Sequence, residues 1–586
     1  MKSPLQETRQ LLLEQIVASM GLDTETVERL LVYTKDDAQG DITLETFQLR
    51  EFYGGMNPAE IADMIASSLM LPDFVSVEHK GPFLNFRLSD VYLAQHALDA
   101  VTEQYGYKPV DHSQQPTIVE YSSPNYGKDL HVGHIRSTIV GEAISRLLFA
   151  SGVHVVRINY PGDVGAHMGK VLTGIDEWHG GILPNDPEKA MTIMRQAYTE
   201  YERNVPSGKE GDSLVIDILP DSERQRAYEL RAKSATMSLN IEYGEQNTVS
   251  LWKQVCDLSR QAHALLYDQL HVAFDYIQPA SSATKRGKAI VAEALKKGIA
   301  VQHGKEITVD FGQGQFQKLL AEDGVAVYAT LDLGIAHLRY DALQFARMIY
   351  VVGAEQAPYF EKLFGLEQRL GYPYAAHCEH LATGHLVLSQ GKMSSRKGNV
   401  TLLKDVLESA VQRAEHVIQE KGKLDAEKAK RVAEMLGIGA FIYNILSKDP
   451  GSTLTYDETS ALRLDGKSAP YAQYAHARAC TLLANATIPQ MYDASQYKTA
   501  EERALIKRIA ELPIAVETAA RTLRPNSITE YVYQLAVAFN RFYTTQKIMG
   551  AEDTATQGAR LVLTDKFRQT MSNALEMICI QAPQEM

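Results

Sequence analysis

The order of secondary structure between residues 117 and 160 limits the fold more than any other feature of the chain. TIVEY (117–121) and HVVRINY (154–160) are rich in β-branched residues and read as strands. Between them, GHIRSTIVGEAISRLLFASG (133–152) has apolar residues at helical spacing and ends in Ser-Gly, a helix stop. A strand, a helix and a second strand form a βαβ unit, which predicts a parallel sheet. The fold class is therefore α/β.

The 586 residues are too many for a single hydrophobic core, and the pattern divides them into three regions. Residues 1–112 mix helical periodicity with a short alternating run and predict a small α/β domain. Residues 113–402 hold the parallel sheet, with a polar, mostly helical insertion near 185–260. From 403 to 586 we expect no strands, and amphipathic segments predict an all-α helical bundle.

Composition and charge exclude several classes of protein. No apolar run is long enough to span a bilayer, and the N-terminal stretch has no apolar block of the secretory kind. A net charge of −13 argues against wholesale coating of nucleic acid but allows a local basic groove.

The cysteines and histidines predict neither a disulfide framework nor a structural metal. The four cysteines are far apart and form no CxxC motif, which fits a cytoplasmic protein. HCEH (377–380) has no third ligand group near it in sequence, so we expect a surface turn there. These cysteines are Cys256, Cys378, Cys480 and Cys579.

The HVGH sequence, residues 131–134, follows a strand and opens a helix. At the carboxyl edge of a parallel sheet this is where ligands bind, and a helix N-terminus suits phosphate. Gly133 allows close approach to the backbone, and His131 and His134 can donate hydrogen bonds to a phosphoryl group. The alternative is a pair of surface histidines at a helix cap.

A second polar segment, LSQGKMSSRKGNVTLL (388–403), crowds Lys392, Arg396 and Lys397 together. It is typical either of a solvated basic loop or of a mobile cationic clamp on a triphosphate.

Together, HVGH and KMSSR resemble the HIGH and KMSKS signatures of class I aminoacyl-tRNA synthetases. The segments SSPNYGKDLHVGHIRSTIVG (122–141), YATLDLGIAHLRY (328–340) and SAPYAQYAHARAC (468–480) resemble the arginyl-tRNA synthetases in particular. Further matching segments lie in all three regions, so the resemblance covers essentially the whole chain. It implies a Rossmann-like catalytic domain over 113–402, a tRNA-contacting domain over 1–112 and an anticodon-binding domain over 403–586.

The resemblance also implies roles for single residues. Tyr328 and Asp332 would hold a guanidinium, because a planar cation suits a ring face and a carboxylate. Lys128 would replace the second lysine of KMSKS, which is Ser395 in this chain. The amino-acid pocket would comprise Ser123, Pro124, Asn125, His134, Tyr328, Asp332 and Gln356. ATP would be bound by His131, Gly133, His134, Lys392, Met393, Ser394, Ser395 and Arg396. Catalysis would rest on Lys128, His131, His134, Lys392 and Arg396. Transfer RNA would contact Phe83, Asn85, Tyr471, Tyr474, Arg478 and Tyr543.

Simpler roles stay open for some of these residues. Asn125 could cap a turn, Tyr328 could be core packing and Asp332 could cap a helix. The aromatic residues assigned to tRNA could belong to the core of the helical bundle.

One position departs from the family pattern. After VAFD, arginyl enzymes usually carry a glutamate-serine pair, whereas Ala280 and Ser281 stand here. A missing carboxylate would remove a charge-assisted hydrogen bond to the guanidinium, about 1.5–3 kcal/mol. We therefore expect a single formal counter-charge, Asp332, and weaker discrimination against lysine or citrulline.

The function that the resemblance implies is ATP-dependent ligation of arginine to tRNA through an arginyl adenylate. Its partners are ATP with Mg²⁺ as substrate, arginine and tRNA, with tRNA bound before activation. We expect a monomer and no membrane. One alternative is a paralogue that activates another amino acid or charges another acceptor. A second is an inactive tRNA-binding regulatory module.

Overall fold

The computed structural model describes residues 3–34, 39–206, 214–217, 219–312, 314–321, 324–388, 402–419 and 424–586. The chain forms two compact units. The first comprises Met1–Pro109, Arg413–Tyr443 and Leu462–Met586, and the second comprises Val110–Gln412 and Asn444–Ala461.

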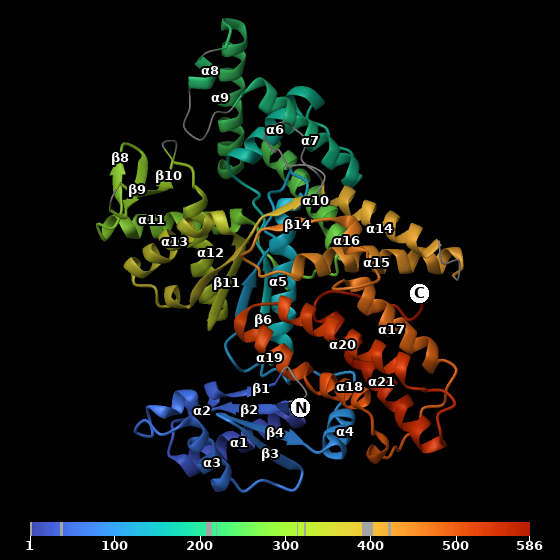
Figure 1. Ribbon diagram of the computed structural model, residues 1–586. Coiled ribbons are helices and arrows are strands. Elements are labelled where there is room, and N and C mark those ends of the chain that lie inside the picture. The colour runs from blue at the N-terminus through green and yellow to red at the C-terminus, as the bar shows by residue number, and fades with distance from the viewer. Residues whose placement is uncertain are drawn as a thin grey trace. The chain divides into compact units, whose positions relative to one another are not determined.

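A five-stranded parallel sheet is the centre of the second unit (Figure 1). Its strand order is β12-β11-β5-β6-β7. The strands are β5 (Thr117–Glu120), β6 (Val155–Asn159), β7 (Tyr276–Ile277), β11 (Arg347–Gly353) and β12 (Cys378–Thr383). β5, β6 and the helix between them, α5 (Val132–Ala150), are the βαβ unit that the sequence predicts.

Helices pack against this sheet, and its central strands are therefore buried on both faces. Ile118 and Val119 are neighbours on β5, so they point to opposite faces, and both are fully buried. Ile118 belongs to one apolar cluster with residues of α11 (Thr284–Lys296), α12 (Tyr328–Leu343) and α13 (Ala357–Leu370). Such double burial is typical of parallel sheets.

HCEH is not a surface turn. Cys378–His380 begins the edge strand β12, and the ring of His380 stacks on Phe360 at 4.6 Å between centroids. Within the described part of the chain, no group of three His, Cys, Asp or Glu residues could hold a metal ion.

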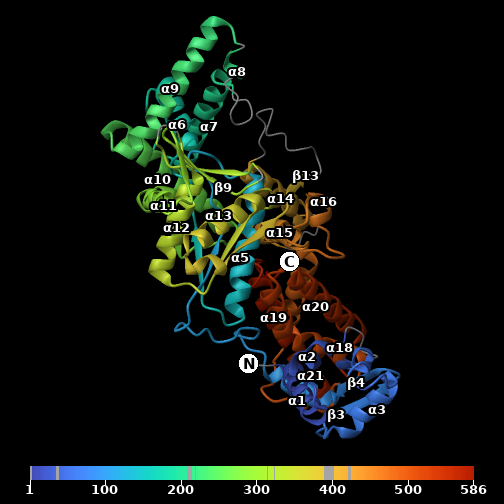
Figure 2. The same cartoon turned by 90° about the vertical axis from the view of Figure 1, so that its left-hand side faces the viewer.

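A helical insertion follows the first βαβ unit, and Figures 1 and 2 show it as teal to green helices. It contains α6 (Ala166–His179), α7 (Pro187–Asn204), α8 (Leu214–Asp217), α9 (Asp221–Tyr243) and α10 (Gln246–Gln269). Residues of α6, α7 and α10 share one apolar core, which includes Leu172, Met194 and Val255.

Two small sheets complete the second unit. One is antiparallel, with the order β10-β9-β8, and comprises β8 (Val301–His303), β9 (Glu306–Asp310) and β10 (Phe316–Leu320). The other pairs β13 (Leu386–Leu388) with β14 (Leu454–Tyr456) in parallel. The expectation of no strand after residue 403 is therefore wrong, because a strand of three residues is too short to show a periodicity.

The first unit contains an antiparallel sheet with the order β1-β2-β4-β3 and a set of helices. The strands are β1 (Leu31–Tyr33), β2 (Ile42–Glu45), β3 (Val75–Lys80) and β4 (Phe83–Leu88). The N-terminal helices are α1 (Pro4–Met20), α2 (Thr24–Leu30), α3 (Pro58–Ser68) and α4 (Asp90–Asp99). The C-terminal helices include α17 (Ala469–Leu483), α18 (Ala500–Ala510), α19 (Leu512–Thr522), α20 (Asn526–Thr545) and α21 (Thr554–Glu576). Of the remaining helices, α15 (Ala426–Leu446) lies mostly in the first unit, α14 (Leu403–Gln419) belongs partly to each unit, and α16 (Glu458–Ala461) belongs to the second.

Buried charges join the N-terminal sheet to the C-terminal helices within this unit. Arg503 of α18 donates from Nη2 to Asp41 at 2.9 Å and from Nε to Asp90 at 2.6 Å. Lys507, one turn further along α18, has its Nζ 3.6 Å from Asp41. Asp41 and Lys507 are each 1% exposed, so water cannot replace these partners.

None of the described helices combines the length and the apolarity that a membrane span requires.

We predict that Asp41→Ala destabilises the first unit by about 3–5 kcal/mol, because it removes the carboxylate of the buried Lys507 and one of the two carboxylates of Arg503. Thermal unfolding would show a lower midpoint. Asp465→Ala is the control, since Asp465 is 71% exposed in its ion pair with Arg463 and exposed pairs contribute little to stability. Equal midpoints for the two variants would contradict the prediction.

Candidate active site

The connection from β5 to α5 has an unusual backbone at the carboxyl edge of the sheet. Ser122 and Ser123 have φ values of 72° and 47°, which residues other than glycine rarely adopt. The strained turn is held by Asn159, whose Oδ1 accepts from Ser123 N at 3.2 Å. Such strain persists only where the surroundings impose it, and it gathers at functional sites.

Asn125 lies directly against the loop after β6. Asn125 and Gly162 form an isolated parallel bridge, and Gly162 N donates to Pro124 O at 3.0 Å. A Cβ at residue 162 would lie 2.3 Å from Asn125 Oδ1, so a larger residue there would displace the Asn125 side chain. Two strand ends therefore fix the Ser123–Pro124–Asn125 segment together.

The two histidines of HVGH lie together at the start of α5. His131 is the N-cap residue, and its Nδ1 accepts from Gly133 N at 3.0 Å. The rings of His131 and His134 are 3.9 Å apart. Burial, with the charge of neighbouring His131, lowers the pKa of His134 to about 3, and burial also lowers the pKa of His131. Both rings are therefore neutral at pH 7, and each can donate one N–H to a phosphate oxygen.

Lys128 lies beside these histidines. Its Nζ is 4.1 Å from the centre of the Tyr198 ring on α7, a cation–π contact. Burial, and then the charge of Lys170, lower the pKa of Lys128. An anion bound beside Lys128 would raise this pKa again, because it stabilises the charged ammonium group.

The first turns of α12 and the loop after β11 form another part of this edge. Tyr328, the first residue of α12, is 62% exposed, which excludes the core-packing alternative. Asp332 lies beyond the cap of that helix and accepts a hydrogen bond from the Tyr359 hydroxyl. Burial, and the charge of Glu120, raise the pKa of Asp332 to about 7. Gln356 is exposed just after β11.

Glu120, which the sequence analysis did not single out, is a second carboxylate near Asp332. It is the last residue of β5, is buried, and pairs with Arg339 of α12. Its charge contributes to the raised pKa of Asp332. Glu120 is itself neutralised by Arg339, so Asp332 stays the one carboxylate predicted to face a guanidinium. The sequence signal for Glu120 was an acidic residue at the end of a buried strand, where ligands bind.

Ala280 packs among apolar side chains, including residues close to Asp332 in sequence on α12. It is 5% exposed in an apolar cluster with Ala283, Leu331 and Ile335. The next residue, Ser281, donates from N and Oγ to the carboxylate of Asp163 at 2.8 and 2.6 Å. A carboxylate at residue 280 would be buried among apolar side chains.

Lys392, Met393, Ser394, Ser395 and Arg396 lie outside the described residues. The chain after them returns to HVGH: Leu402 forms an antiparallel bridge with His131, and Leu403 N donates to Leu130 O at 3.2 Å. The end of this basic segment is therefore adjacent to the two histidines.

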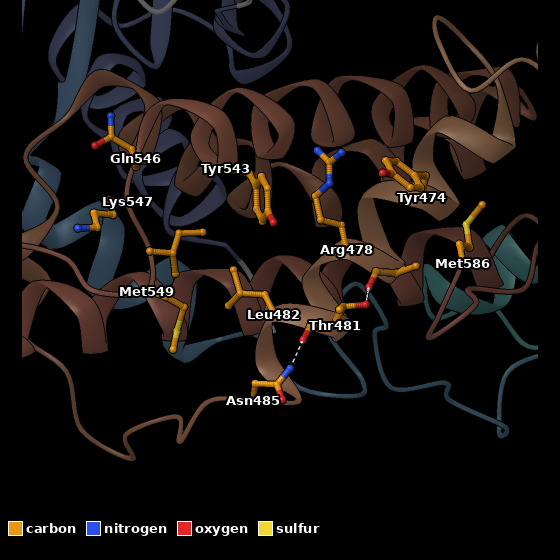
Figure 3. A pocket seen from close by; sticks show the side chains of 12 residues that line it. Tyr474, Arg478, Thr481, Leu482, Asn485, Tyr543, Gln546, Lys547, Met549 and Met586 are labelled. Atoms are coloured by element: carbon orange, nitrogen blue, oxygen red, sulfur yellow. Dashed lines mark hydrogen bonds between the residues drawn. The ribbon is translucent and has the colours of Figure 1, made fainter. Parts of the chain in front are cut away.

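A separate hollow of about 900 Å³ lies among the C-terminal helices of the first unit. Figure 3 shows Arg478 between two tyrosine rings, with its guanidinium carbon 4.7 Å from the centre of Tyr474 and 4.8 Å from that of Tyr543. Arg478 Nη1 also donates to Asn540 Oδ1 at 3.1 Å. All three side chains line the hollow, so they are not bundle core. Tyr471 lies outside that lining, with its ring 5.8 Å from Tyr533.

Of the two residues on β4 assigned to RNA, the structure presents one at the surface. Phe83 is half-buried and meets the exposed ring of Phe47 edge-on at 5.6 Å. Asn85 is 6% exposed, and its Oδ1 accepts from Thr43 Oγ1 at 2.8 Å.

Three family profiles match the chain, and together they span most of it. Residues 97–457 match the catalytic domain of "tRNA synthetases class I (R)", residues 472–586 match the "DALR anticodon binding domain", and residues 7–88 match the "Arginyl tRNA synthetase N terminal domain". The chain belongs to the class I arginyl-tRNA synthetases. The family resemblance expected from HVGH and KMSSR is thus confirmed.

Individual relatives of the chain match it along its whole length. The arginine–tRNA ligase of Clostridium perfringens is 30% identical over 586 residues, covering 99% of this chain and all of the relative. The arginyl-tRNA synthetase structures of Thermus thermophilus and Plasmodium falciparum have TM-scores of 0.81 and 0.78. Each alignment covers both chains completely, at 22% and 17% identity, so these two show the fold.

Buried histidines of this synthetase predict a loss of stability in acid. Burial lowers the pKa of His263, on α10, to about 4, whereas an unfolded histidine titrates near 6.5. Below about pH 6.5 only the unfolded state binds the proton, so the free energy of unfolding falls by up to about 1.4 kcal/mol per pH unit until about pH 4.

We therefore expect His263→Gln to lose less thermal stability between pH 7 and pH 5 than the unsubstituted protein. The ring of His263 contacts the ring of Tyr126, and a positive charge on His263 would lower the pKa of His134. His303→Gln, at an exposed site, is the control. Equal losses in both variants would contradict the assignment.

Proposed function

We propose that the carboxyl edge of the parallel sheet joins arginine to ATP and then transfers it to tRNA. In the first step a carboxylate oxygen of arginine attacks the α-phosphorus of ATP, and pyrophosphate leaves with its Mg²⁺. In the second, a ribose hydroxyl of the tRNA 3′ end attacks the adenylate carbonyl, and AMP leaves. The observation that supports this most is the pair of adjacent histidines at the start of α5, directly after the strained turn at the carboxyl edge of the sheet.

Arginine would be recognised through its charge and its planar shape. A guanidinium beside Asp332 would lower the raised pKa of that carboxyl and keep it ionised. Tyr328, exposed one turn before Asp332, would stack on the guanidinium plane. The Ser123–Pro124–Asn125 segment and Gln356 would bind the α-amino and carboxylate groups. Because Glu120 is neutralised by Arg339, Asp332 would be the one formal counter-charge, and discrimination against lysine or citrulline should be weak, as the sequence implied.

The phosphate groups would be bound by neutral histidines and by cations. His131 and His134 would donate N–H groups at the N-terminus of α5, and Gly133 would admit the nucleotide to the backbone. Lys128 would neutralise charge that develops on the α-phosphate, together with Lys392 and Arg396. Met393, Ser394 and Ser395 would complete this contact. Catalysis would then consist of positioning and charge stabilisation, with no covalent enzyme intermediate.

The anticodon would be read in the hollow of the first unit. Tyr474, Arg478 and Tyr543 offer two ring faces and a guanidinium plane, the groups on which unpaired bases stack. Phe83 would contact another part of the tRNA. Asn85, which is bonded to Thr43, would support the surface around Phe83. Tyr471, whose ring lies beside Tyr533, would support the hollow. We further propose a cytoplasmic monomer that binds tRNA before it activates arginine.

Pyrophosphate exchange across the twenty amino acids, with and without total tRNA, tests this function. We expect exchange with arginine only, dependent on tRNA. Exchange with a different amino acid would favour a specialised paralogue, and no exchange with retained tRNA binding would favour a regulatory module.

Asp332→Asn should reduce arginine activation by about 100- to 1000-fold, because it leaves a buried guanidinium without one counter-charge. The Michaelis constant for ATP should change little. Asp341→Asn is the control, because Asp341 lies on the same helix and is 56% exposed. An Asp332→Asn enzyme with normal arginine kinetics would place the guanidinium elsewhere.

Arg478→Ala should raise the Michaelis constant for tRNA by about 5- to 150-fold, since one base stack contributes about 1–3 kcal/mol. Activation at saturating tRNA should be nearly unchanged. Arg541→Ala serves as control, because Arg541 lies on α20 and is 69% exposed in its pair with Glu501. Unaltered tRNA affinity in Arg478→Ala would exclude the hollow as the anticodon site.

A further inference from the structure

We propose that Ser259 and His263, on helix α10 of the insertion, are positioning residues that hold Lys128 at the phosphate site. This inference rests on the proposed role of Lys128 in neutralising the α-phosphate. It assigns a catalytic purpose to a helix whose sequence suggested only a polar insertion.

The two side chains bind backbone groups of two consecutive residues, Gly127 and Lys128, in the turn that precedes HVGH. Gly127 N donates to Ser259 Oγ at 2.9 Å, and the ring of His263 donates from Nε2 to Lys128 O at 2.9 Å. Ser259 and His263 are four residues apart, so they lie on the same face of α10, one turn from each other. The turn is therefore fixed at two neighbouring points by one rigid helix.

These hydrogen bonds are out of reach of water. Ser259 is 0% and His263 3% exposed, and α10 is anchored by Val255 in the core of the insertion. Removing either side chain would leave a buried N–H or C=O group without its partner. The turn is also restricted at Gly127, which has a φ of +80° and where a Cβ would lie against the side chain of Val171.

Helix α7 completes the arrangement by holding the side chains of the same turn. Tyr198 contacts Lys128 Nζ, and Arg195 Nη1 lies 3.0 Å from Asp129 Oδ2. Thus α10 holds the backbone and α7 the side chains. A lysine has four rotatable bonds, so a loose backbone would spread its ammonium over many positions, and about 1 Å of misplacement can cost about 100-fold in rate.

The test is a double-mutant cycle on pyrophosphate exchange by the full chain with tRNA, using Ser259→Ala, His263→Ala and Lys128→Met. We expect His263→Ala to lower kcat by about 10- to 100-fold, with little change in the Michaelis constant for arginine. Ser259→Ala should act in the same direction. In the Lys128→Met background either substitution should have less than about a twofold effect, because the group that they position is gone. His263→Gln keeps a donor in place and should restore most of the rate.

One control separates positioning from stability. Thr248→Ala removes buried atoms near the start of α10, away from the Gly127–Lys128 turn. It should lower the thermal midpoint but leave kcat unchanged. If His263→Ala does not fold, then Ser259→Ala and His263→Gln carry the same test.

The outcomes also separate this inference from the proposed function. If Lys128→Met activates arginine normally, the role of Lys128 itself is wrong. If Lys128→Met is impaired but His263→Ala lowers the rate equally in both backgrounds, Lys128 acts as proposed and its positioning by α10 is overturned.

Discussion

The buried ion pair between Glu120 and Arg339 joins the end of β5 to α12, and the proposed arginine pocket depends on it. Arg339 is fully buried, also donates to Gln278 at 2.8 Å, and lies over the ring of Tyr160. A buried charge is tolerated only with its partners, so these contacts restrict how α12 packs. That packing sets where Asp332 lies, and the charge of Glu120 adds to the effect of burial in raising the pKa of Asp332.

The phosphate side is organised differently, by the backbone and by the insertion. The turn between β5 and α5 is strained at Ser122 and Ser123, and glycine at residue 162 lets the loop after β6 lie against Asn125 without displacing its side chain. Further along, Ser259 and His263 hold the same connection from α10. The site is therefore assembled from strand ends, which supply the groups, and from inserted helices, which limit their movement.

The sequence predicted the positions of candidate residues most directly where these residues form a contiguous motif. His131, Gly133 and His134 lie at the predicted helix start, and Tyr328 and Asp332 lie on one helix, because helical spacing converts directly into a common face. It was weak where partners are distant: the sequence did not indicate that Glu120, at the end of β5, pairs with Arg339 of α12. The short strand β14 was missed because three residues carry no periodicity.

The sequence by itself determined the α/β class, the family and the residue types of the site, since these depend on local periodicity and on motifs that are read along the chain. Only the tertiary structure decided that Glu120 pairs with Arg339, that Tyr543 lies against Arg478, and that α10 reaches the turn before HVGH. Each of these contacts joins residues more than 60 positions apart. Their geometry follows from how helices and strands pack, which no local pattern specifies.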